Sequence, residues 1–183
     1  MKVKRVLLGV TGSIAAYKAA DLVSRLRKLG REVTVVMTES AGKLVTPITF
    51  AAMSGNAVFH DLWDLEHSHR PEHVDLADRH DLMVIAPATA NCLGKIAAGI
   101  ADDILSTTVM VVASTMPVLI APAMNTRMFE NAVVQRNIQT LRDLGYRFVE
   151  PAEGYLACGD YGKGKMAEPE TIVEEIERIL AES

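Results

Sequence analysis

The sequence predicts one α/β domain, an open parallel sheet with helices on both faces. Short apolar runs alternate with amphipathic helix patterns along the chain, and the runs are apolar on both faces, as in strands buried within a parallel sheet. The 183 residues are 49% hydrophobic and 23% charged, which suffices for one sizeable core. Because no repeat or linker divides the chain, we expect a single domain over residues 1–183.

In the first half of the chain, RVLLGV (Arg5–Val10) is expected to form the first strand. A turn at Thr11–Ser13 leads into a helix that runs to about Leu29, and Gly30 is a natural end for it. EVTVVM is the next predicted strand, and PITFAAMSG predicts a short helix with proline at its start and glycine past its end. The polar segment Asp61–Glu72 is predicted to be a surface loop.

In the second half, EHVDLADRHDL predicts a helix, and DLMVIAP, TVMVVAS and PVLIAPA each predict a strand. Helices are expected to begin near Thr89 and to cover about Glu130–Leu144, with a short strand at YRFVE after the second. PETIVEEIERIL predicts a closing helix, and its inward face carries Ile172, Ile176, Ile179 and Leu180.

Composition excludes several classes of partner. The net charge is −4 without a basic block, which disfavours nucleic acid and anionic membranes. The two cysteines, Cys92 and Cys158, are too few for a disulfide scaffold. The apolar run after the basic N-terminus is too short for a signal peptide, and no stretch approaches the roughly 18 apolar residues of a membrane span. We therefore expect a soluble cytoplasmic protein.

Ligands of such folds bind beyond the carboxyl ends of the strands, so the residues that follow each strand are candidates. After the first strand, the Gly12–Ser13 turn opens a helix, where backbone N–H groups and the helix dipole favour an anion such as phosphate. Ser13 could instead be an ordinary N-cap. The turn lacks the full GxGxxG and GxxxxGK[ST] patterns, which weakens dinucleotide and P-loop interpretations.

Small polar residues follow the next two strands. Thr38 and Ser40 suit a phosphate or a ribityl chain, whereas Glu39 between them could hold a ribose diol and so favour NAD. Thr89 and Asn91 stand at a helix start, where they either cap the helix or contact a ligand.

Two later features have a structural and a functional interpretation. Cys92, one turn into the helix near Thr89, is expected to be packed rather than reactive. After the fifth strand, Asn125 is either an N-cap or an amide placed to bind a carboxylate or amide of a substrate. The methionines near it are expected to pack rather than to form a cofactor site: Met116, Met124 and Met128.

The histidines are clustered in the sequence: His60, His67, His69, His73 and His80. The segment lacks the partners and the spacing of zinc motifs, so we expect no metal site. His67 and His69 fit a solvated loop. His73 stands at the start of a predicted helix, from which it could act as a base or as a hydrogen-bond donor.

The stretch ACGDYGKGKMAEP (Ala157–Pro169) has a composition that does not suit a core. Its glycines permit unusual backbone angles and motion. Lys163 and Lys165 would favour a thiolate at Cys158 if they lie close to it. The alternative is an exposed loop that happens to carry a thiol.

Several of these stretches occur together in one known family. GSIAAYK, the histidine helix followed by APATAN, PAMNTRMF and ACGDYGKGKMAEP resemble the phosphopantothenoylcysteine decarboxylase family, the flavin-dependent cysteine decarboxylases of coenzyme A biosynthesis. The resemblance covers about Val6 to Pro169, and Phe129 departs from it where the family often has tryptophan. It implies a flavodoxin-like (Rossmann-type) fold, FMN, and a homotrimer or dodecamer of trimers with each active site at a subunit contact. It also implies a phosphopantothenoylcysteine synthetase as a fused or separate partner.

The resemblance assigns roles by position. His73 matches the active-site histidine, Asn125 the residue that holds the substrate carboxylate, and Cys158 the cysteine of the reductive step. A flexible flap over about residues 152–168 would carry Cys158 to the substrate. No metal is implied. The implied FMN contacts are Gly12, Ser13, Ile14, Thr38, Ser40, Thr89, Ala90, Asn91 and Ala123.

The implied reaction converts 4′-phosphopantothenoylcysteine to 4′-phosphopantetheine. Oxidation of the thiol-bearing carbon gives a thioaldehyde, which accepts the electrons released by decarboxylation, and the resulting enethiol is then reduced. His73 would orient the substrate and assist proton transfer, Asn125 would fix the carboxylate, and Cys158 would supply a proton during reduction.

Three other interpretations stay open. A peptidyl-cysteine decarboxylase shares the histidine and Pro-x-Met-Asn motifs and forms an enethiol, but it needs no reductive cysteine, so Cys158 argues against it. A non-catalytic flavin-binding regulator would carry a long acidic tail, which this sequence lacks. An NAD-dependent dehydrogenase is weakened by the incomplete glycine pattern.

Overall fold

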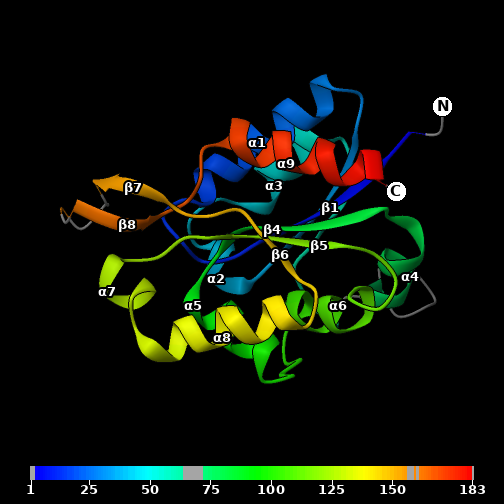
Figure 1. The fold of residues 1–183 in the computed structure, drawn as a ribbon. Coiled ribbons are helices and arrows are strands. Elements are labelled where there is room, and N and C mark those ends of the chain that lie inside the picture. The colour runs from blue at the N-terminus through cyan, green and yellow to red at the C-terminus, as the bar shows by residue number, and fades with distance from the viewer. Residues whose placement is uncertain (1–2, 64–71, 156–158, 160, 183) are drawn as a thin grey trace.

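The computed structural model describes residues 3–63, 72–155, 159 and 161–182, and it confirms the α/β class. Within these residues, six parallel strands form one sheet between two layers of helices. A separate antiparallel hairpin, β7–β8, projects from one end of the molecule (Figure 1).

The elements have the following bounds. The strands are β1 (Arg5–Val10), β2 (Glu32–Met37), β3 (Val58–Phe59), β4 (Leu82–Ala88), β5 (Val118–Pro122), β6 (Arg147–Phe148), β7 (Ala152–Tyr155) and β8 (Tyr161–Lys165). The helices are α1 (Ala16–Lys28), α2 (Glu39–Gly42), α3 (Pro47–Ser54), α4 (Glu72–Arg79), α5 (Ala90–Ala97), α6 (Ile104–Val112), α7 (Thr126–Phe129), α8 (Ala132–Asp143) and α9 (Pro169–Glu182).

The strand order is β3-β2-β1-β4-β5-β6, the order of doubly wound α/β folds. Without the two-residue edge strand β3, the order is the one that flavodoxin-like folds share. The direction of winding reverses between β1 and β4, which are hydrogen-bonded neighbours. This switch point is where ligands of such folds bind, so the loops after β1 and β4 are the first places to look for a site.

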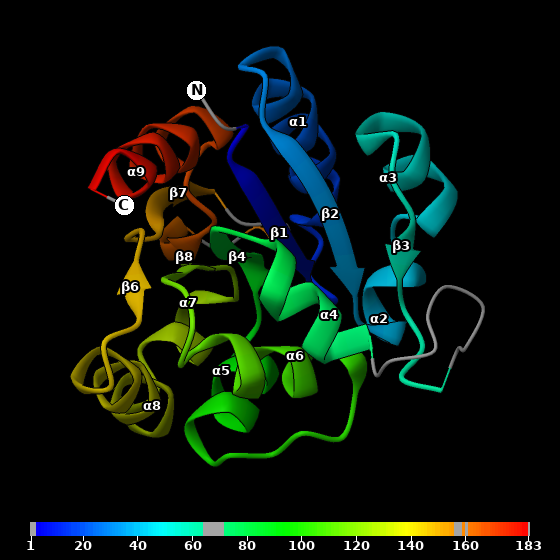
Figure 2. The same ribbon diagram turned by 90° about the vertical axis from the view of Figure 1, so that its right-hand side faces the viewer.

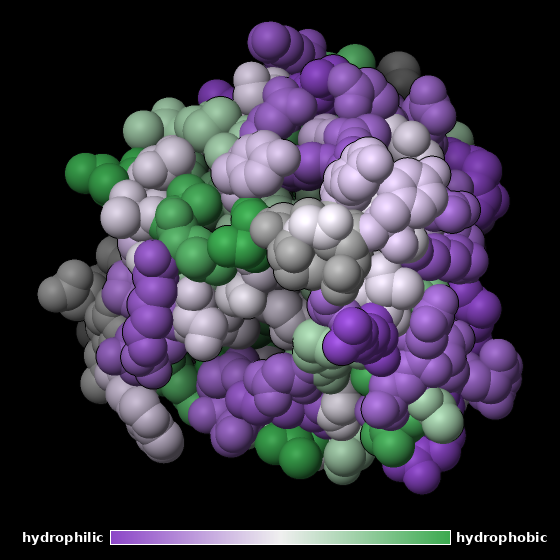
Figure 3. All heavy atoms as spheres, turned by 90° about the vertical axis from the view of Figure 1, so that its left-hand side faces the viewer, coloured by the Kyte–Doolittle hydropathy of each residue, from purple (hydrophilic) through white to green (hydrophobic). Residues whose placement is uncertain are grey.

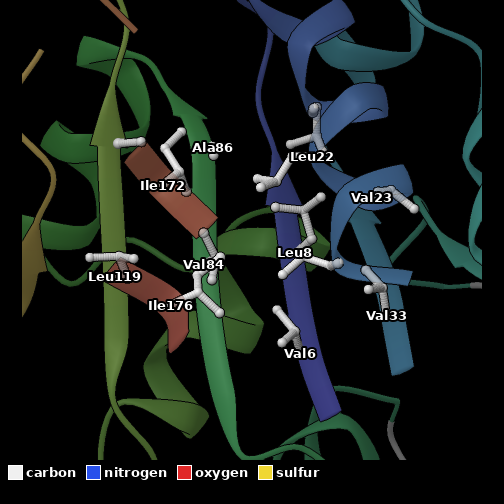
Figure 4. Packing of buried hydrophobic residues seen from close by; sticks show 14 of the residues in the cluster. Val6, Leu8, Leu22, Val23, Val33, Val84, Ala86, Leu119, Ile172 and Ile176 are labelled. Carbon is white, nitrogen blue, oxygen red and sulfur yellow. The ribbon is translucent and has the colours of Figure 1, made fainter. Parts of the chain in front are cut away.

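The core lies on both faces of the sheet, because the strands alternate their side chains between the faces. On one face, strand residues such as Leu8 and Val84 pack against α1, α3 and α9 (Figure 4). On the other face, Leu7 and Met83 pack against α4, α5, α6 and α8. Figure 2 shows these two groups of helices on opposite sides of the strands. The inward residues predicted for the closing helix are all buried in this core.

Sequence signals place the helix ends as expected. α3 begins at Pro47 and ends at Ser54, and its C-cap Gly55 has a φ of 72°. Gly30, after α1, has a φ of 76°. A positive φ is strained for residues with a Cβ, so glycine suits both positions.

The strand predicted at TVMVVAS is wrong, because Thr108–Val112 belongs to the helix α6. Asp103 forms a capping box: its carboxylate accepts from the Ser106 N–H, and the Asp103 N–H donates to Ser106 Oγ. The buried residues Ile104, Thr108 and Val112 recur at the spacing of a helix face. Capping and this periodicity outweigh the strand preference of the valines.

The expectation that Ala157–Pro169 does not suit a core is wrong for its last part. Met166 is 1% exposed and Ala167 is 4% exposed, and both belong to the core cluster beneath α1 and α9. Cys158 and the predicted loop histidines His67 and His69 lie outside the described residues. Of the helices described, none is both long and apolar enough to cross a membrane.

Candidate functional site

Two neighbouring cavities lie where the strands of the sheet end. The larger, about 550 Å³, is called here the switch-point cavity, and residues that line it include Thr11, Gly12, Thr38, Ser40, Thr89 and Asn91. The second, about 450 Å³, is called the hairpin cavity, and its lining includes Ser13, Ile14, Lys18, Ala123, Asn125 and Lys165. Both volumes lie in the range of small-molecule sites.

Two threonines of the switch-point cavity, Thr38 and Thr89, are helix N-caps. Thr38 Oγ1 accepts from the Ala41 N–H at 3.2 Å, and Thr89 Oγ1 accepts from the Cys92 N–H at 3.3 Å. In the part of the chain that the structure describes, no acceptor takes the hydroxyl hydrogen of either threonine. Each threonine is therefore a hydrogen-bond donor to an anionic or carbonyl-bearing ligand.

Gly12 brings the loops after β1 and β2 into close contact. A Cβ at Gly12 would lie 2.5 Å from Ser40 Cβ and 3.2 Å from the Ser40 carbonyl carbon. No side chain fits there without moving the loop. The missing Cβ therefore allows the two loops to pack against each other at the edge of the cavity, and this contact is called here the cradle at Gly12.

Thr11 links the loops on the two sides of the switch point. Its hydroxyl donates to the Pro87 carbonyl at 2.7 Å and accepts from the Thr89 N–H at 3.1 Å, and the side chain is 1% exposed. Thr11 could not be selected from the sequence, because its two partners, Pro87 in β4 and Thr89 just after β4, lie far away in the chain.

The floor of the switch-point cavity contains Cys92 and an ion-pair cluster. Burial raises the pKa of the Cys92 thiol to about 12, so Cys92 is packed and unreactive, as expected. Lys95 Nζ lies 2.6 Å from Asp102 Oδ1 and 2.7 Å from Asp103 Oδ2. Burial acts to raise the pKa of Asp103, but hydrogen bonds from Lys95 and Ser106 outweigh burial and lower it.

Glu39 lines the same cavity but is already paired. Its carboxylate lies 2.9 Å from Lys43 Nζ, and the hydrogen bond and charge of Lys43 lower the pKa of Glu39. Both side chains are largely exposed, at 70% for Lys43 and 86% for Glu39, so the pair is weak and leaves the ribose-binding interpretation of Glu39 open.

Asn125 stands in the hairpin cavity at the start of α7. Its Oδ1 accepts from the Arg127 N–H at 2.8 Å, so the cap fixes the orientation of the amide. The sequence left capping and ligand binding as alternatives for Asn125, Thr38 and Thr89. The structure shows that all three cap helices and also line a cavity.

The hairpin lies directly against the Asn125 segment through its glycines. The Met124 N–H donates to the Gly164 carbonyl at 3.0 Å. Gly164 has a φ of 136°, and a Cβ there would lie 2.5 Å from Met124 O. A Cβ at Gly162 would lie 2.6 Å from Thr126 Oγ1. Only residues without a Cβ allow the strand β8 to approach this closely.

Several of the remaining predicted residues do not occupy the positions expected from the sequence. Ser13 is not the N-cap of α1; that position is Ala15, whose N–H donates to Ser13 Oγ at 3.3 Å. Ala90 and His73 line neither cavity. Of the methionines expected to pack, Met116 is buried and Met124 is half-buried, but Met128 is 47% exposed and lines the switch-point cavity. Among the described residues, no group of three acidic, histidine or cysteine side chains is placed to hold a metal.

The fold, the cradle at Gly12 and the donor hydroxyls define a class of protein that binds a phosphate-bearing ligand at the switch point. Comparison with known families gives the same class: residues 1–181 match the flavoprotein family, and the chain belongs to that family.

Within this family, the chain is similar to two curated proteins of coenzyme A biosynthesis. It is 42% identical over 177 residues to a probable phosphopantothenoylcysteine decarboxylase of Streptococcus mutans, covering 97% of this chain and 99% of that one. It is 51% identical over 179 residues to the coenzyme A biosynthesis bifunctional protein CoaBC of Bacillus subtilis. That match covers 98% of this chain but 44% of the bifunctional protein.

Solved structures agree with this placement. A cysteine-to-serine mutant of PPC decarboxylase in complex with pantothenoylaminoethenethiol aligns over 100% of both chains, with a TM-score of 0.85 and 33% identity. The FMN-dependent cysteine decarboxylase SpaF aligns over 98% of this chain and 96% of its own, with a TM-score of 0.83 and 36% identity.

Proposed function

We propose that this chain is an FMN-dependent phosphopantothenoylcysteine decarboxylase that acts in coenzyme A biosynthesis in the cytoplasm. The observation that carries the proposal is that two cavities of different chemistry meet at consecutive residues, Gly12 and Ser13. A cofactor in the switch-point cavity would therefore lie beside a substrate in the hairpin cavity. The similarity to phosphopantothenoylcysteine decarboxylases over nearly the whole chain supports the identity of both ligands.

The residues present fit FMN. Thr38 and Thr89 would donate hydroxyl hydrogens, and the close contact of Gly12 with Ser40 holds the loops after β1 and β2 together beside the ligand. The other proposed contacts are Ser13, Ile14, Ser40, Ala90, Asn91 and Ala123. When bound, FMN supplies reversible hydride acceptance next to the substrate.

Asn125 and His73 would act on the substrate itself. The amide of Asn125, oriented by its cap, would hold the carboxylate without neutralising it, so the carboxylate stays ready to leave as carbon dioxide. His73 would orient the substrate and move a proton at its thiol. Cys158 would protonate the enethiol during reduction, and the segment around β7–β8, at about residues 152–168, would act as a flap over the substrate.

The position of His73 supports an oligomer. His73 is half-buried at the start of α4 and lines neither cavity of its own chain. We propose a homotrimer, in which His73 of one copy completes the hairpin cavity of the next. Trimers could assemble further into a dodecamer, and a synthetase, fused or separate, would supply the substrate.

The proposal is tested by incubating the FMN-loaded protein with 4′-phosphopantothenoylcysteine and following carbon dioxide and product mass. Saturated 4′-phosphopantetheine is the expected product. A protein that binds no FMN after reconstitution, or that releases no carbon dioxide, contradicts the proposal. The Cys158→Ser variant should release carbon dioxide but stall at a product lighter by two hydrogen atoms.

The shared site is tested by mixing inactive variants. His73→Asn and Asn125→Asp should each bind FMN and lack turnover. Mixed and reassembled, they should regain part of the activity, since some sites then receive an intact His73 from one copy and an intact Asn125 from another. A monomeric mass by light scattering, together with no regained activity, would contradict the proposed trimer.

A peptidyl-cysteine decarboxylase is the second candidate, because SpaF is similar in fold and sequence. The two functions differ in product. An enethiol made from a peptide with a C-terminal cysteine, and no reaction with 4′-phosphopantothenoylcysteine, would favour this second function.

A further inference from the structure

The charged side chains described in the lining of the hairpin cavity are all positive. Its described lining contains the two cations Lys18 and Lys165 and no aspartate or glutamate. Lys18 comes from α1 and Lys165 from the last position of β8, so two elements far apart in sequence bring positive charge to one cavity. A site of this kind favours a ligand with a negative group.

A single carboxylate lies between the two lysines. Glu168 Oε2 is 2.8 Å from Lys18 Nζ, and Glu168 Oε1 is 3.0 Å from Lys165 Nζ. Hydrogen bonds from Lys18 and then Lys165 lower the pKa of Glu168, so it is ionised at neutral pH. Two positive charges against one negative charge leave the group with one net positive charge beside the cavity.

The two ammonium groups differ in how they can respond to a ligand. The side chain of Lys18 is 11% exposed, and its ammonium group is paired with Glu168. The side chain of Lys165 is 39% exposed and lies at the cavity. Exposed ion pairs contribute little to stability, so Lys165 can exchange Glu168 for a stronger anion at small cost.

Lys163, two residues before Lys165, is directed elsewhere. In a regular strand, residues two apart share a face. Here the pairing register shifts: Ala152 pairs with Lys165, whereas the next residue, Glu153, pairs with Lys163. Gly164 is the extra residue of this bulge and has a φ of 136°.

Because of the bulge, Lys163 lines a different cavity from Lys165. Lys163 Nζ lies 5.8 Å from the centre of the Phe129 ring and 3.9 Å from Glu150 Oε2. It lines a cavity of about 200 Å³ with Phe129 and Glu150, whereas Lys165 lines the hairpin cavity. The two lysines, which composition alone could not distinguish, therefore have different surroundings.

We propose that Lys165, with Lys18 and Glu168 behind it, forms a subsite for the phosphomonoester end of the substrate and sets the preference for phosphorylated over unphosphorylated substrates. This inference rests on the proposed function for the identity of the substrate. The other end of the substrate would lie at Asn125, in the same cavity. Figure 3 views the end of the molecule that carries the hairpin and shows apolar side chains beside hydrophilic ones, a surface suited to a ligand with an apolar body and a charged end.

The test compares Lys165→Gln with Lys163→Gln, a matched control on the same strand. In the first arm, kcat/KM of the FMN-loaded protein is measured for 4′-phosphopantothenoylcysteine and for pantothenoylcysteine. The preference for the phosphorylated substrate should fall about tenfold in Lys165→Gln, the lower end expected for a hydrogen bond to a charged group, and stay unchanged in Lys163→Gln. A preference that survives in Lys165→Gln overturns the subsite.

The second arm needs no turnover. Calorimetric titration of the same proteins with 4′-phosphopantothenate and with pantothenate measures the affinity gained from the phosphate. A gain in the wild-type protein that Lys165→Gln loses supports the subsite, even if the first arm shows no decarboxylation and so contradicts the proposed function. No gain in the wild-type protein, or an equal gain in Lys165→Gln, overturns the subsite.

Discussion

The switch-point cavity and the hairpin cavity meet at one turn but are held open in different ways. In the switch-point cavity, side chains bond to backbone: Thr11 joins the loops after β1 and β4, and Thr38, Thr89 and Asp103 each cap the helix they precede. All of these bonds are made within the chain and none needs a ligand, so they preorganise the cavity.

The hairpin cavity depends instead on how β8 lies on the Asn125 segment. The contact is made by backbone at Gly162 and Gly164, and a two-stranded hairpin has little stability of its own. The two cavities therefore suit different ligands. The switch-point cavity is fixed and suits a resident cofactor, whereas the wall that β8 forms in the hairpin cavity can separate and suits a substrate that must enter and leave.

The largest effect is expected from Gly12→Ala, which tests how the switch-point cavity is held in shape. The new Cβ would collide with Ser40, and if the full overpacking cost of about 1–3 kcal/mol falls on binding, FMN affinity drops by about 5- to 150-fold. Gly42→Ala is the control, because no atom lies within 4 Å of a Cβ at Gly42. Titration with FMN, followed by flavin fluorescence, measures both. Equal affinities in the two variants would refute the cradle.

Gly164→Ala tests the contact between β8 and the Asn125 segment in the hairpin cavity. The Cβ would meet Met124 O, and the positive φ adds strain, so the hairpin should lift from the Asn125 segment. We expect kcat/KM for 4′-phosphopantothenoylcysteine to fall about tenfold while the Kd for FMN stays the same. Gly154→Ala, in the facing strand, makes only an ordinary contact with Lys165 and should change neither value. A loss of FMN from Gly164→Ala would show that the switch-point cavity and the hairpin cavity are not independent.

Thr11→Val removes the link between the loops and keeps the volume of the side chain. The Thr89 N–H would lose its partner, and the Pro87 carbonyl would keep only the bond from the Thr11 N–H at 3.3 Å, so we expect a cost of about 1–3 kcal/mol. Only part of this cost affects the cofactor, so we expect FMN affinity to fall about threefold to tenfold and Thr11→Ser to restore it. A stable Thr11→Val protein with normal FMN affinity would show that the link does not shape the cavity.

The smallest effect concerns pH and Asp103. Because the pKa of Asp103 is lowered in the folded protein, the ionised carboxylate stabilises the fold above its usual pKa of about 4, and this stabilisation is lost as pH falls through the lowered pKa. Asp103→Asn should lower the free energy of unfolding by about 0.5–1 kcal/mol at pH 7, and the difference from wild type should shrink toward pH 3.

Urea unfolding at several pH values measures this difference. Asp102→Asn is the control, since the side chain of Asp102 is more exposed and caps no helix among the described residues. A difference for Asp103→Asn that is independent of pH would exclude the ion pair as its cause.

The fold could be predicted because its signals are local and repeated: the long strands β1, β2, β4 and β5 are largely apolar, and helices such as α1 and α9 have a periodic apolar face. TVMVVAS misled the prediction because its β-branched residues resemble a strand, while the deciding signal, the Asp103–Ser106 box, precedes it. Cys92 was correctly expected to be packed from its place one turn into α5.

The site could be predicted only where the residues follow a strand directly. Thr38, Thr89 and Asn125 stand at such positions and line the cavities. Thr11 was missed because its partners, Pro87 and Thr89, lie in and just after β4, which becomes a neighbour only through sheet pairing. Lys165 could not be separated from the second lysine of its strand, because the bulge that divides them is set by contact with Met124.

The sheet described here is narrow at both margins. Each edge strand, β3 and β6, has two residues, so little unpaired main chain is offered to a neighbouring molecule. Long exposed edges let chains join strand to strand and aggregate, and short ones prevent it. Copies of this chain would therefore associate through the side chains of helices and loops, which keeps assembly selective while the sheet itself stays closed to extension.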